Sequence, residues 1–544
     1  MLRNFFLFIA LSSTLALFSP TAQAQPATLS LDSTVLNVST LINGLDVPWE
    51  ILWGPDNYIW MTERGGTVSR VNPETGAKTP ILEIADCAEV QETGLLGMVL
   101  HPQFDTNPYV YLVYTYWGTT GNITERLVRY TYNGTELIDS LILLDNIPGT
   151  YTHAGSRLII TPDLKLIMTT GDAQNQPAAQ SFTQLIGKFL RLNLDGSIPE
   201  DNPSPTSLIY SYGHRNAQGV VLAPNGIMYS SEHGPTNDDE FNIITPNRNY
   251  GWPDVHGFCN LPSEITFCNN NNVVEPLVAW TPTLAVAGID YYDHPAIPEW
   301  RNTVLLCAMK AQRLVRLSLS ADGLQVTNQT NYFNNQVGRI RDICISPTGD
   351  VYISTTNEDA YGDGTPDRII KIHNPNYQMP IAEAAFEAND SCLVVNFSNN
   401  STNADTYLWN FGNNVTSSEP NPTHIYAAEG TYTVQLIASN GNSSDTTTLS
   451  LTIDDCISRV PSVLEQAINI YPNPAVKYIQ IDFPSELQGG TLQICPINGQ
   501  KVYEQILPIQ QKTLTVHTEH LPRNTYIATL KKGNISISKT ITLQ

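Results

Sequence analysis

A short pattern that recurs six times in the first 375 residues constrains the fold more than any other feature of this chain. Each copy has a proline or another turn residue, then an apolar-rich strand, then a polar tip. The copies begin at Gly54, Asn107, Thr161, Ala223, Glu299 and Ser346. A spacing of about 50 to 75 residues is typical of the blades of a β-propeller. The sequence therefore predicts an all-β fold that begins with a six-bladed β-propeller; a pair of β-sandwiches is the alternative.

Superposition of these copies predicts where the functional groups gather. It places five residues at one equivalent position, just past the end of the same strand: Arg64, Gly171, His233, Lys310 and Thr356. Equivalent strands of a propeller end on the same face, so these tips are expected to converge on one mouth of the central channel. The chemistry should therefore lie on that face.

The stretch from Tyr212 to Pro253 carries the densest polar chemistry, in the segments YGHRNAQG, SEHGPTNDDEFN and NYGWP. It offers donors, backbone carbonyls and hard oxygen ligands from Arg215, Asn216, Gly234, Pro235, Asp238, Asp239 and Glu240. That combination suits an anionic ligand held against a calcium ion. It points towards an enzyme with a bound cofactor.

Four cations are expected at the tips of different blades: Arg215, Lys310, Arg339 and Arg341. Their convergence in an acidic protein predicts a concentrated anion site, for which a polycarboxylate cofactor is the natural occupant. His153, in the segment THAGSRL, is the candidate catalytic base, although a histidine taken alone is more often a surface residue.

These motifs resemble a known family. The chain from about Val35 to His373 is similar to the soluble sugar dehydrogenases that depend on pyrroloquinoline quinone (PQQ), the glucose/sorbosone dehydrogenase group. The ordered matches are ETGLLGMVLHPQF, HAGSRL, GHRNAQG, SEHGPTNDDEFN, NYGWP, WTPT, CAMK and GRIRD. The resemblance implies a six-bladed propeller, PQQ and Ca²⁺ as cofactors, a sugar substrate and an external electron acceptor.

The resemblance also implies roles for individual residues. His153 matches the general base, and Arg215 matches the cation beside the reacting quinone oxygen. Glu92 and Thr152 flank the base and cofactor where the family carries Gln and Asp, so another group must orient His153. The remaining matched cofactor contacts are Asn216, Thr283, Lys310, Arg339 and Arg341.

The resemblance further implies two calcium sites. The backbone carbonyls of Gly234 and Pro235 match ligands of the ion that polarises the quinone. Glu240 and Tyr250 match contributors to a separate structural calcium site.

Two further regions follow the propeller, which we expect at residues 30–378. Residues 384–454 contain YLWNFGN and HIYAAEGTYTVQLIASN and resemble a PKD domain, a small immunoglobulin-like β-sandwich with Trp409 and Tyr432 in its core. Residues 455–467 form a polar linker. Residues 468–544, which begin with INIYPNPAVKYIQIDF, resemble the C-terminal sorting domain of the type IX secretion system and are expected to form a second such sandwich. The type IX machinery is therefore an expected partner.

Charge and targeting signals bear on location and partners. A net charge of -23 disfavours nucleic acid and anionic membranes as partners. Residues 1–24 read as a signal peptide, with Arg3, an apolar stretch and Ala22–Ala24 as the cleavage site. No later segment is apolar enough for a membrane span, so a secreted or surface-attached protein is expected.

The cysteines are too few for a disulfide scaffold. Cys259 and Cys268 are the best candidate pair, whereas Cys307 and Cys344 are expected to be buried.

Two functions remain open on sequence alone. The first is a secreted quinoprotein that oxidises the anomeric carbon of an aldose or related sugar to a lactone, with PQQ as the hydride acceptor. The alternative is a propeller without turnover that binds carbohydrate or protein, similar to the hedgehog-interacting-protein-like propellers. Glu92 favours the alternative, whereas the set His153, Arg215, Lys310 and Arg339 favours the enzyme.

Overall fold

The computed structural model describes residues 25–544 apart from residues 360, 392, 442, 454–462, 498 and 534. The predicted signal peptide and most of the predicted linker lie outside the described residues. The chain divides into two compact units at Gln378 and Met379. Neither unit contains, in its described part, a helix that is both long and apolar enough to cross a membrane.

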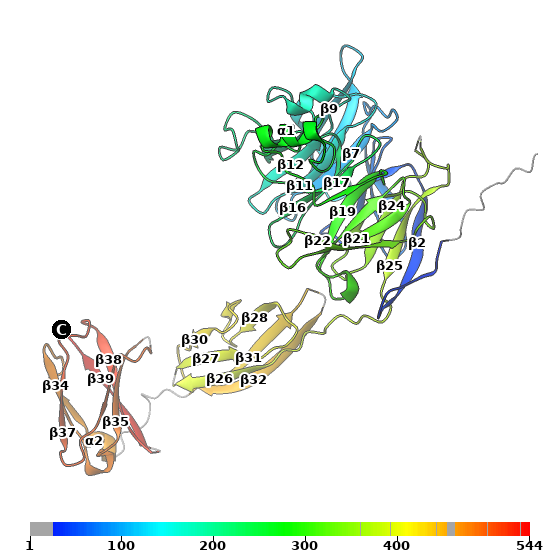
Figure 1. Cartoon of the computed structure of the whole chain (residues 1–544). Coiled ribbons are helices and arrows are strands. Elements are labelled where there is room, and N and C mark those ends of the chain that lie inside the picture. The colour runs from blue at the N-terminus through cyan, green and yellow to red at the C-terminus, as the bar shows by residue number, and fades with distance from the viewer. Residues whose placement is uncertain are drawn as a thin grey trace, which may run out of the picture. The chain divides into compact units, whose positions relative to one another are not determined.

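The first unit is a six-bladed β-propeller, as the repeats predict (Figure 1). The first three blades are antiparallel four-stranded sheets. Blade 1 consists of β3 (Pro48–Trp53), β4 (Ile59–Glu63), β5 (Thr67–Val71) and β6 (Lys78–Glu83). Blade 2 consists of β7 (Leu95–Leu100), β8 (Tyr109–Trp117), β9 (Ile123–Tyr132) and β10 (Leu137–Pro148). Blade 3 consists of β11 (Gly155–Ile160), β12 (Lys165–Thr170), β13 (Lys188–Asn193) and β14 (Ile209–Tyr212).

The other three blades complete the ring. Blade 4 consists of β15 (Ala217–Leu222), β16 (Met228–Glu232), β17 (Asp239–Ile243) and β18 (Val278–Trp280). Blade 5 consists of β19 (Val286–Tyr292), β20 (Thr303–Ala308), β21 (Arg313–Leu319) and β22 (Val326–Tyr332). Blade 6 consists of β23 (Ile340–Ile345), β24 (Val351–Thr355), β25 (Asp367–His373), β2 (Val35–Leu45) and β1 (Thr28–Ser30).

The ring is closed by a strand from the other end of the unit. Strand β2 pairs with β25, in a register that runs from Asn37 opposite His373 to Leu45 opposite Asp367. Because β2 belongs to the last blade, the first and last segments of the propeller share one sheet. This pairing protects an edge that would otherwise be exposed.

Each of the six sequence repeats is the second strand of a blade, namely β4, β8, β12, β16, β20 and β24. These strands are covered by the adjacent blades, which is why they read as apolar runs; all five residues of β4 are buried. Trp60 of β4, for example, packs in one core cluster with Leu95 and Met98 of blade 2. The outermost strand β10, in contrast, is largely exposed.

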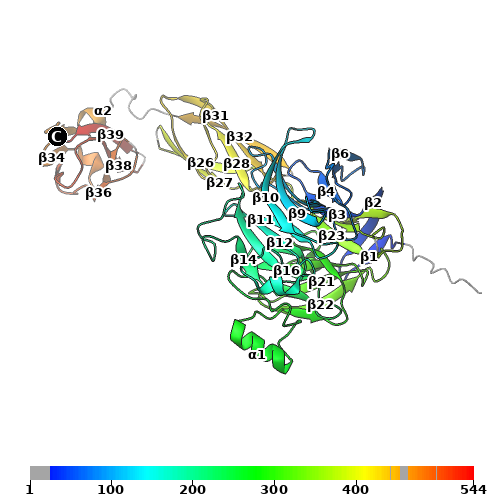
Figure 2. The same ribbon diagram turned by 90° about the horizontal axis from the view of Figure 1, so that it is seen from above.

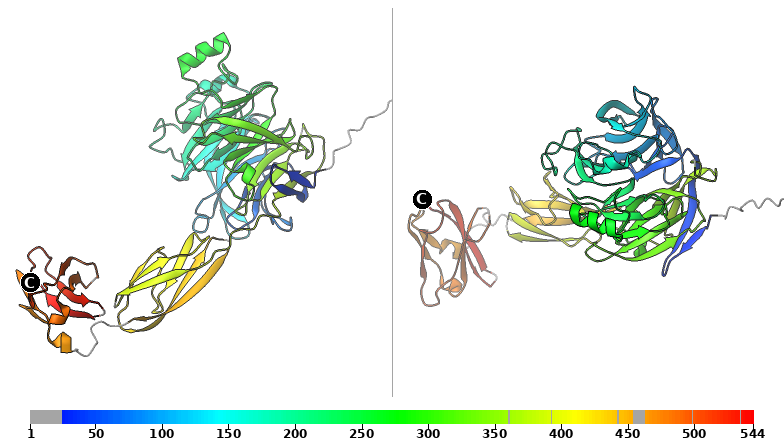
Figure 3. Two further views of the ribbon diagram at one scale, coloured as in Figure 1. Left: turned by 60° about the horizontal axis from the view of Figure 1, so that its bottom comes forward. Right: turned by 45° about the horizontal axis from the view of Figure 1, so that its top comes forward.

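A long insertion between β17 and β18 carries the helix α1 (Pro262–Asn271), which projects from the body of the propeller (Figures 2 and 3). A disulfide joins Cys259 to Cys268, so the predicted pair is confirmed. Cys307 and Cys344 are buried free thiols, also as predicted.

The second unit contains two small β-sandwiches, each with two sheets. In the first, β26 (Phe386–Ser391), β27 (Val394–Asn399) and β30 (Thr423–Ile425) face β28 (Thr406–Asn410), β29 (Thr416–Ser417), β31 (Gly430–Ser439) and β32 (Ser444–Ile453). The side chain of Trp409 is fully buried in its core, and Tyr432 packs on Tyr426 with 4.2 Å between ring centroids.

The second sandwich follows the short helix α2 (Val463–Gln466). Its two sheets consist of β33 (Asn469–Tyr471), β34 (Tyr478–Asp482) and β37 (Thr513–His517), and of β35 (Thr491–Pro496), β36 (Tyr503–Ile506), β38 (Thr525–Lys532) and β39 (Ile535–Thr542). One core of alternating inward-facing apolar residues, such as Ile479 and Ile481 of β34, fills the space between them.

Candidate functional site

The predicted functional groups lie where the second strands of the blades end and where the innermost strands β11, β15 and β23 begin. A cavity of about 360 Å³ is lined by four of the five superposed tip residues, namely Arg64, His233, Lys310 and Thr356. It is also lined by Glu92, Asn216, Arg339 and Arg341 from the predicted site. Residues from all parts of the propeller sequence therefore meet at one mouth.

The fifth tip residue, Gly171, makes room for the candidate base. A Cβ atom added to Gly171 would lie 1.7 Å from the carbonyl oxygen of His153. This is a severe clash, so any residue other than glycine would displace the His153 backbone. The backbone of His153 itself has φ of 58°, in the left-handed region that is costly for a residue with a side chain. Strain at this position persists only because several neighbours fix the segment.

His153 is held through three of its nitrogen atoms. Its backbone N–H donates to Glu92 Oε2 at 3.1 Å, its Nδ1 lies 2.7 Å from Asp172 Oδ1, and its Nε2 lies 3.1 Å from Arg215 Nη2. A guanidinium can only donate and a carboxylate can only accept, so the proton sits on Nδ1 and the lone pair on Nε2. That tautomer suits a general base acting through Nε2.

Asp172 orients the imidazole. It is fully buried, and its second carboxylate oxygen accepts a hydrogen bond from Trp252 Nε1 at 2.8 Å. Thr152, the other neighbour of the base, accepts a hydrogen bond from Gln174 Nε2 at 2.6 Å. The orienting group expected from elsewhere is therefore Asp172, one residue beyond the repeat tip Gly171.

Arg215 and Asn216 connect the base to blade 4. Arg215 Nη1 donates to the carbonyl of His233 at 3.1 Å, and burial lowers the pKa of its guanidinium. The Asn216 side-chain oxygen accepts a hydrogen bond from the Gly155 N–H at 3.0 Å. Arg215 lines a smaller adjoining cavity with Gly234 and Pro235, whereas its neighbour Asn216 lines the main one.

A buried carboxyl supports the base segment from blade 2. Glu125 of β9 is 2% exposed and accepts a hydrogen bond from Ser156 Oγ at 2.5 Å. Burial raises its pKa from 4.5 to about 8, against the opposing effect of the Ser156 hydroxyl. Between about pH 4.5 and pH 8, Glu125 is therefore protonated in the folded protein and ionised in the unfolded chain.

Glu125→Gln is expected to flatten the loss of stability at alkaline pH. Because the folded pKa is raised, the stabilising contribution of Glu125 is complete below about pH 4.5 and is lost as the pH rises through about 8. The amide cannot ionise, so the Tm of the variant should fall less than that of the wild type between acidic and alkaline buffers. Exposed Glu136 offers the control: Glu136→Gln should keep the wild-type slope, and parallel curves for Glu125→Gln would contradict the prediction.

The prediction that the four cations come from four different blades is wrong for two of them, because Arg339 directly precedes β23 of blade 6 and Arg341 lies on it. The cofactor cations also differ in their partners. Lys310 Nζ donates to Thr283 Oγ1 at 3.0 Å, and Arg339 pairs with Asp359 at 3.1 Å. Arg341 Nη2 donates to Gln218 Oε1 at 2.8 Å, and its guanidinium lies 4.5 Å from the Trp49 ring. Arg64, at the equivalent tip of blade 1, is neutralised by Glu89 at 3.1 Å.

Arg341 is the clearest sign that an anion belongs in this cavity. It is 7% exposed, its Nε has no partner among the described residues, and no described carboxylate forms an ion pair with it. Burial, with repulsion by Arg157, lowers the pKa of Arg341 to about 9. A buried guanidinium without a counter-ion is costly, so the donor set fits a ligand with several carboxylates.

Backbone carbonyls are the available metal ligands. Gly234 and Pro235 line the smaller cavity beside Arg215 and Glu240, and no described donor forms a hydrogen bond with either carbonyl oxygen. The described residues contain no cluster of three or more His, Cys, Asp or Glu side chains arranged to hold a metal. Carbonyl oxygens suit a hard ion such as Ca²⁺.

Glu240 and Tyr250 lie near each other in the same cavity, but both side chains have protein partners. The Tyr250 hydroxyl donates to the carbonyl of Ile243 at 2.7 Å, so only its backbone is free to bind a metal. Glu240 accepts hydrogen bonds from Gly257 N–H and from Asn242, both at 2.9 Å. Burial, together with the charge of Glu232, raises the pKa of Glu240 to about 8.

Several site residues escaped the sequence reasoning. Asp172, Gln218, Trp49, Trp252 and Tyr361 all contact or line the site. Asp172 had a usable signal, because it directly follows the tip of the third repeat in the segment TTGD, and Gln218 and Trp252 lie inside the quoted segments GHRNAQG and NYGWP. Trp49 and Tyr361 lie in none of the quoted motifs.

The six-bladed propeller, with His153, Arg215 and Lys310 near one mouth, matches a family of sugar dehydrogenases, which are oxidoreductases. The family described as Glucose / Sorbosone dehydrogenase matches residues 45–362, which is more than half of the chain. The chain belongs to the glucose/sorbosone dehydrogenase family. A PKD domain matches residues 377–454, and a secretion system C-terminal sorting domain matches residues 469–544. The sorting domain indicates a secreted or cell-surface protein.

Relatives and solved structures agree with this family. The chain is 32% identical over 404 residues to quinoprotein glucose dehydrogenase B of Acinetobacter calcoaceticus, covering 58% of this chain and 84% of that protein. It is 30% identical over 370 residues to an aldose sugar dehydrogenase of Escherichia coli, covering 65% and 95%. The PQQ-bound aldose sugar dehydrogenase of Streptomyces coelicolor matches with a TM-score of 0.55 and 29% identity, over 64% of this chain and 99% of that one.

Proposed function

We propose that the propeller is a PQQ-dependent dehydrogenase that oxidises the anomeric carbon of an aldose or related sugar to a lactone. The observation that carries this proposal is the placement of the His153 imidazole, with Nδ1 2.7 Å from Asp172 Oδ1 and Nε2 3.1 Å from Arg215 Nη2. A base and a cation side by side suit removal of a hydroxyl proton while negative charge develops nearby.

The residues of the chain bind, orient and move one proton. His153 Nε2 accepts the proton of the anomeric hydroxyl, and Asp172 stabilises the imidazolium that forms. Arg215, which now donates to Nε2, is also the cation that would face the developing charge. Glu92 fixes the backbone of the base through the His153 N–H.

Bound PQQ would supply a two-electron acceptor for the hydride that leaves the anomeric carbon. Its carboxylates would be held by Lys310, Arg339 and Arg341, with Thr283 and Asn216 as further polar contacts. Gly234 and Pro235 would hold Ca²⁺, whose charge polarises the cofactor. The electrons then pass to an external acceptor, outside the cell.

Reconstitution tests the proposal directly. PQQ and Ca²⁺ are added to purified apo-protein, and quinone absorbance and dye reduction are followed with a panel of aldoses. We expect stoichiometric PQQ uptake and dye reduction that requires both sugar and PQQ. Absence of PQQ uptake would eliminate a quinoprotein.

A binding propeller without turnover is the second candidate, and Glu92 is the observation that favours it. Its carboxylate lies against the backbone of the base and places a negative charge at the cavity wall. Sugar binding by calorimetry without dye reduction, in protein that has taken up PQQ, would decide for this alternative.

Lys310→Ala is expected to weaken PQQ binding by about tenfold, at the low end of the loss for a charge-assisted hydrogen bond because Lys310 is exposed. Titration of apo-protein with PQQ, followed by absorbance, measures the change. Lys165→Ala, at the end of β12 remote from the tip Gly171, is the matched control. Equal affinities of the two variants would place the anion site elsewhere.

A further inference from the structure

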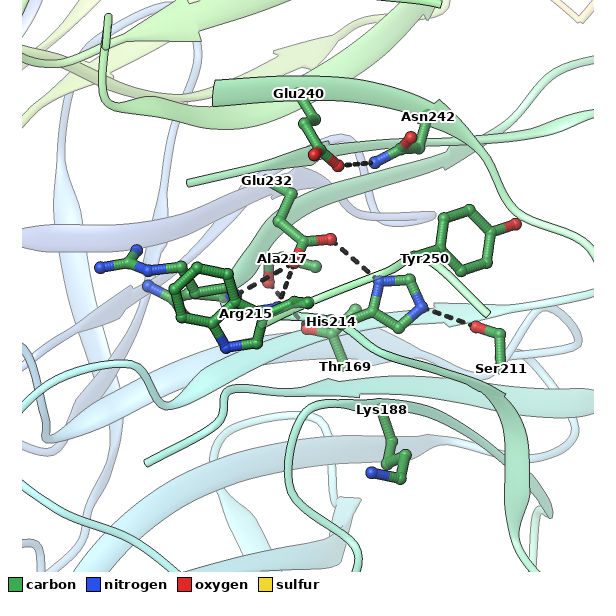
Figure 4. A network of polar contacts seen from close by, with 12 residues as sticks. Thr169, Lys188, Ser211, His214, Arg215, Ala217, Glu232, Glu240, Asn242 and Tyr250 are labelled. Atoms are coloured by element: carbon green, nitrogen blue, oxygen red, sulfur yellow. Dashed lines mark hydrogen bonds and ion pairs between the residues drawn. The ribbon is translucent and has the colours of Figure 1, made fainter. Parts of the chain in front are cut away.

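A buried set of hydrogen bonds links Ser211, His214 and Glu232, and His214 directly precedes Arg215 in the chain (Figure 4). His214 Nδ1 is 2.9 Å from Glu232 Oε2, and His214 Nε2 is 2.9 Å from Ser211 Oγ. Serine, histidine and carboxylate in this order are also used by hydrolases. Here Ser211 and His214 are 0% exposed and Glu232 is 4% exposed, so no substrate can reach the hydroxyl.

The hydrogen-bond partners of His214 determine which of its ring nitrogens carries the proton. The Glu232 carboxylate accepts, so His214 donates from Nδ1 and accepts the Ser211 hydroxyl proton at Nε2. The imidazole lies between two rings, with centroids 4.7 Å from Phe189 and 4.4 Å from Tyr250. Its orientation is therefore fixed by packing as well as by hydrogen bonds.

The other oxygen of Glu232 holds the main chain of the site. Glu232 Oε1 accepts the backbone N–H of Arg215 and the backbone N–H of Asn216, the latter at 3.3 Å. The segment between β14 and β15 has no regular sheet partner for these groups, and buried N–H groups require an acceptor. Glu232 is the last residue of β16, so a strand end anchors the segment.

Both anchored residues contact the segment that carries the candidate base. Arg215 Nη2 lies 3.1 Å from His153 Nε2, and the Asn216 side chain accepts the N–H of Gly155 at 3.0 Å. One carboxylate in blade 4 therefore controls two contacts to the base segment in front of blade 3.

We propose that Glu232 and His214 are positioning residues, which set the backbone of Arg215 and Asn216 so that the guanidinium meets the base. The inference rests on the proposed sugar oxidation for its catalytic consequence. Its structural consequence is independent of PQQ and of turnover.

A pair of variants separates geometry from charge. Glu232→Gln keeps an oxygen for both N–H groups, and its amide can donate to His214 Nδ1 when the imidazole proton moves to Nε2 and is accepted by Ser211. Glu232→Ala leaves both N–H groups without an acceptor. We expect kcat to fall about 10- to 100-fold in Glu232→Ala, with the sugar KM nearly unchanged, and less than about threefold in Glu232→Gln.

Hydrogen exchange of the apo-protein gives the readout that does not need activity. The amides of residues 213–217 should exchange faster in Glu232→Ala than in the wild type, and at the wild-type rate in Glu232→Gln. Leu192→Ala, which removes a fully buried core side chain of β13, is the control for general destabilisation. It should lower Tm without altering kcat or local exchange.

The outcomes are distinct. Equal losses of kcat in both Glu232 variants would overturn the proposal, because the charge and not the geometry would then matter. Unchanged exchange in Glu232→Ala would overturn it as well. Altered exchange in a protein that never oxidises sugar would instead reject the proposed function and leave the positioning role intact.

Discussion

His153→Ala is expected to lower kcat for sugar oxidation by about two to four orders of magnitude, while PQQ still binds. The Nε2 atom of His153 lies 3.1 Å from Arg215 Nη2, and Asp172 holds the other ring nitrogen at 2.7 Å. The cofactor cations Lys310, Arg339 and Arg341 are untouched by the change. Stopped-flow reduction of the PQQ-loaded protein by sugar measures the chemical step separately from electron transfer to the dye.

The propeller contains a matched control for this variant. His373 Nδ1 is paired with Asp350 Oδ1 at 2.6 Å, and its half-exposed ring lies at the end of β25 in the outer part of blade 6. His373→Ala should leave kcat unchanged. Full activity of His153→Ala would show that another group takes the proton.

Arg341→Met is expected to raise the Kd for PQQ by about 30-fold or more, which is the typical cost of removing one partner of a buried charge pair. The same change should leave the Tm of the apo-protein unchanged or higher. Arg341 is buried against Trp49 and Met309 and forms no ion pair with a carboxylate of the described residues, so an apolar side chain removes a buried charge that only more distant carboxylates attract. A raised Kd with an unchanged or higher Tm would show that Arg341 serves cofactor binding and does not stabilise the fold.

Two measurements check whether Arg341→Met weakens PQQ binding without lowering Tm, namely thermal unfolding of the apo-protein and PQQ titration at equilibrium. Arg316, on blade 5, donates to the carbonyl of Glu299 at 2.6 Å and serves as the control. Arg316→Met should lower Tm and keep the PQQ affinity. A large loss of Tm in Arg341→Met, with PQQ affinity retained, would mean that Arg341 is structural.

The repeats predicted the blades because their signals are local. A turn residue, an apolar run and a polar tip are all present within about a dozen residues, and burial of β4, β12 and β16 by neighbouring blades requires such runs. Closure of the ring by β2 has no local signal, because its partner β25 lies more than 300 residues away. The insertion with α1 was likewise not predicted beyond its disulfide.

The residues of the site likewise divide into those with a local sequence signal and those without one. His153, Arg215 and the cations Lys310, Arg339 and Arg341 could be named from motifs, since each has a charged or titratable side chain in a distinctive segment. Nothing in the sequence marks Glu232 as the acceptor for the Arg215 and Asn216 N–H groups, or Gln218 as the partner of Arg341. These residues matter because burial removes water from certain polar atoms, and each such atom then needs a partner from the protein. The tertiary structure decides which atoms these are.

The amino-acid order alone determined the number of blades, the two sandwiches that follow and the residue types available for chemistry, because these depend on local turns, periodicity and side-chain identity. Tertiary structure decided which nitrogen of His153 carries its proton, which arginine keeps an unbalanced charge and which carboxylate supports the loop beneath them. Those properties arise when strands from different blades exclude solvent around a few polar atoms, so each atom must take its partner from a distant part of the chain.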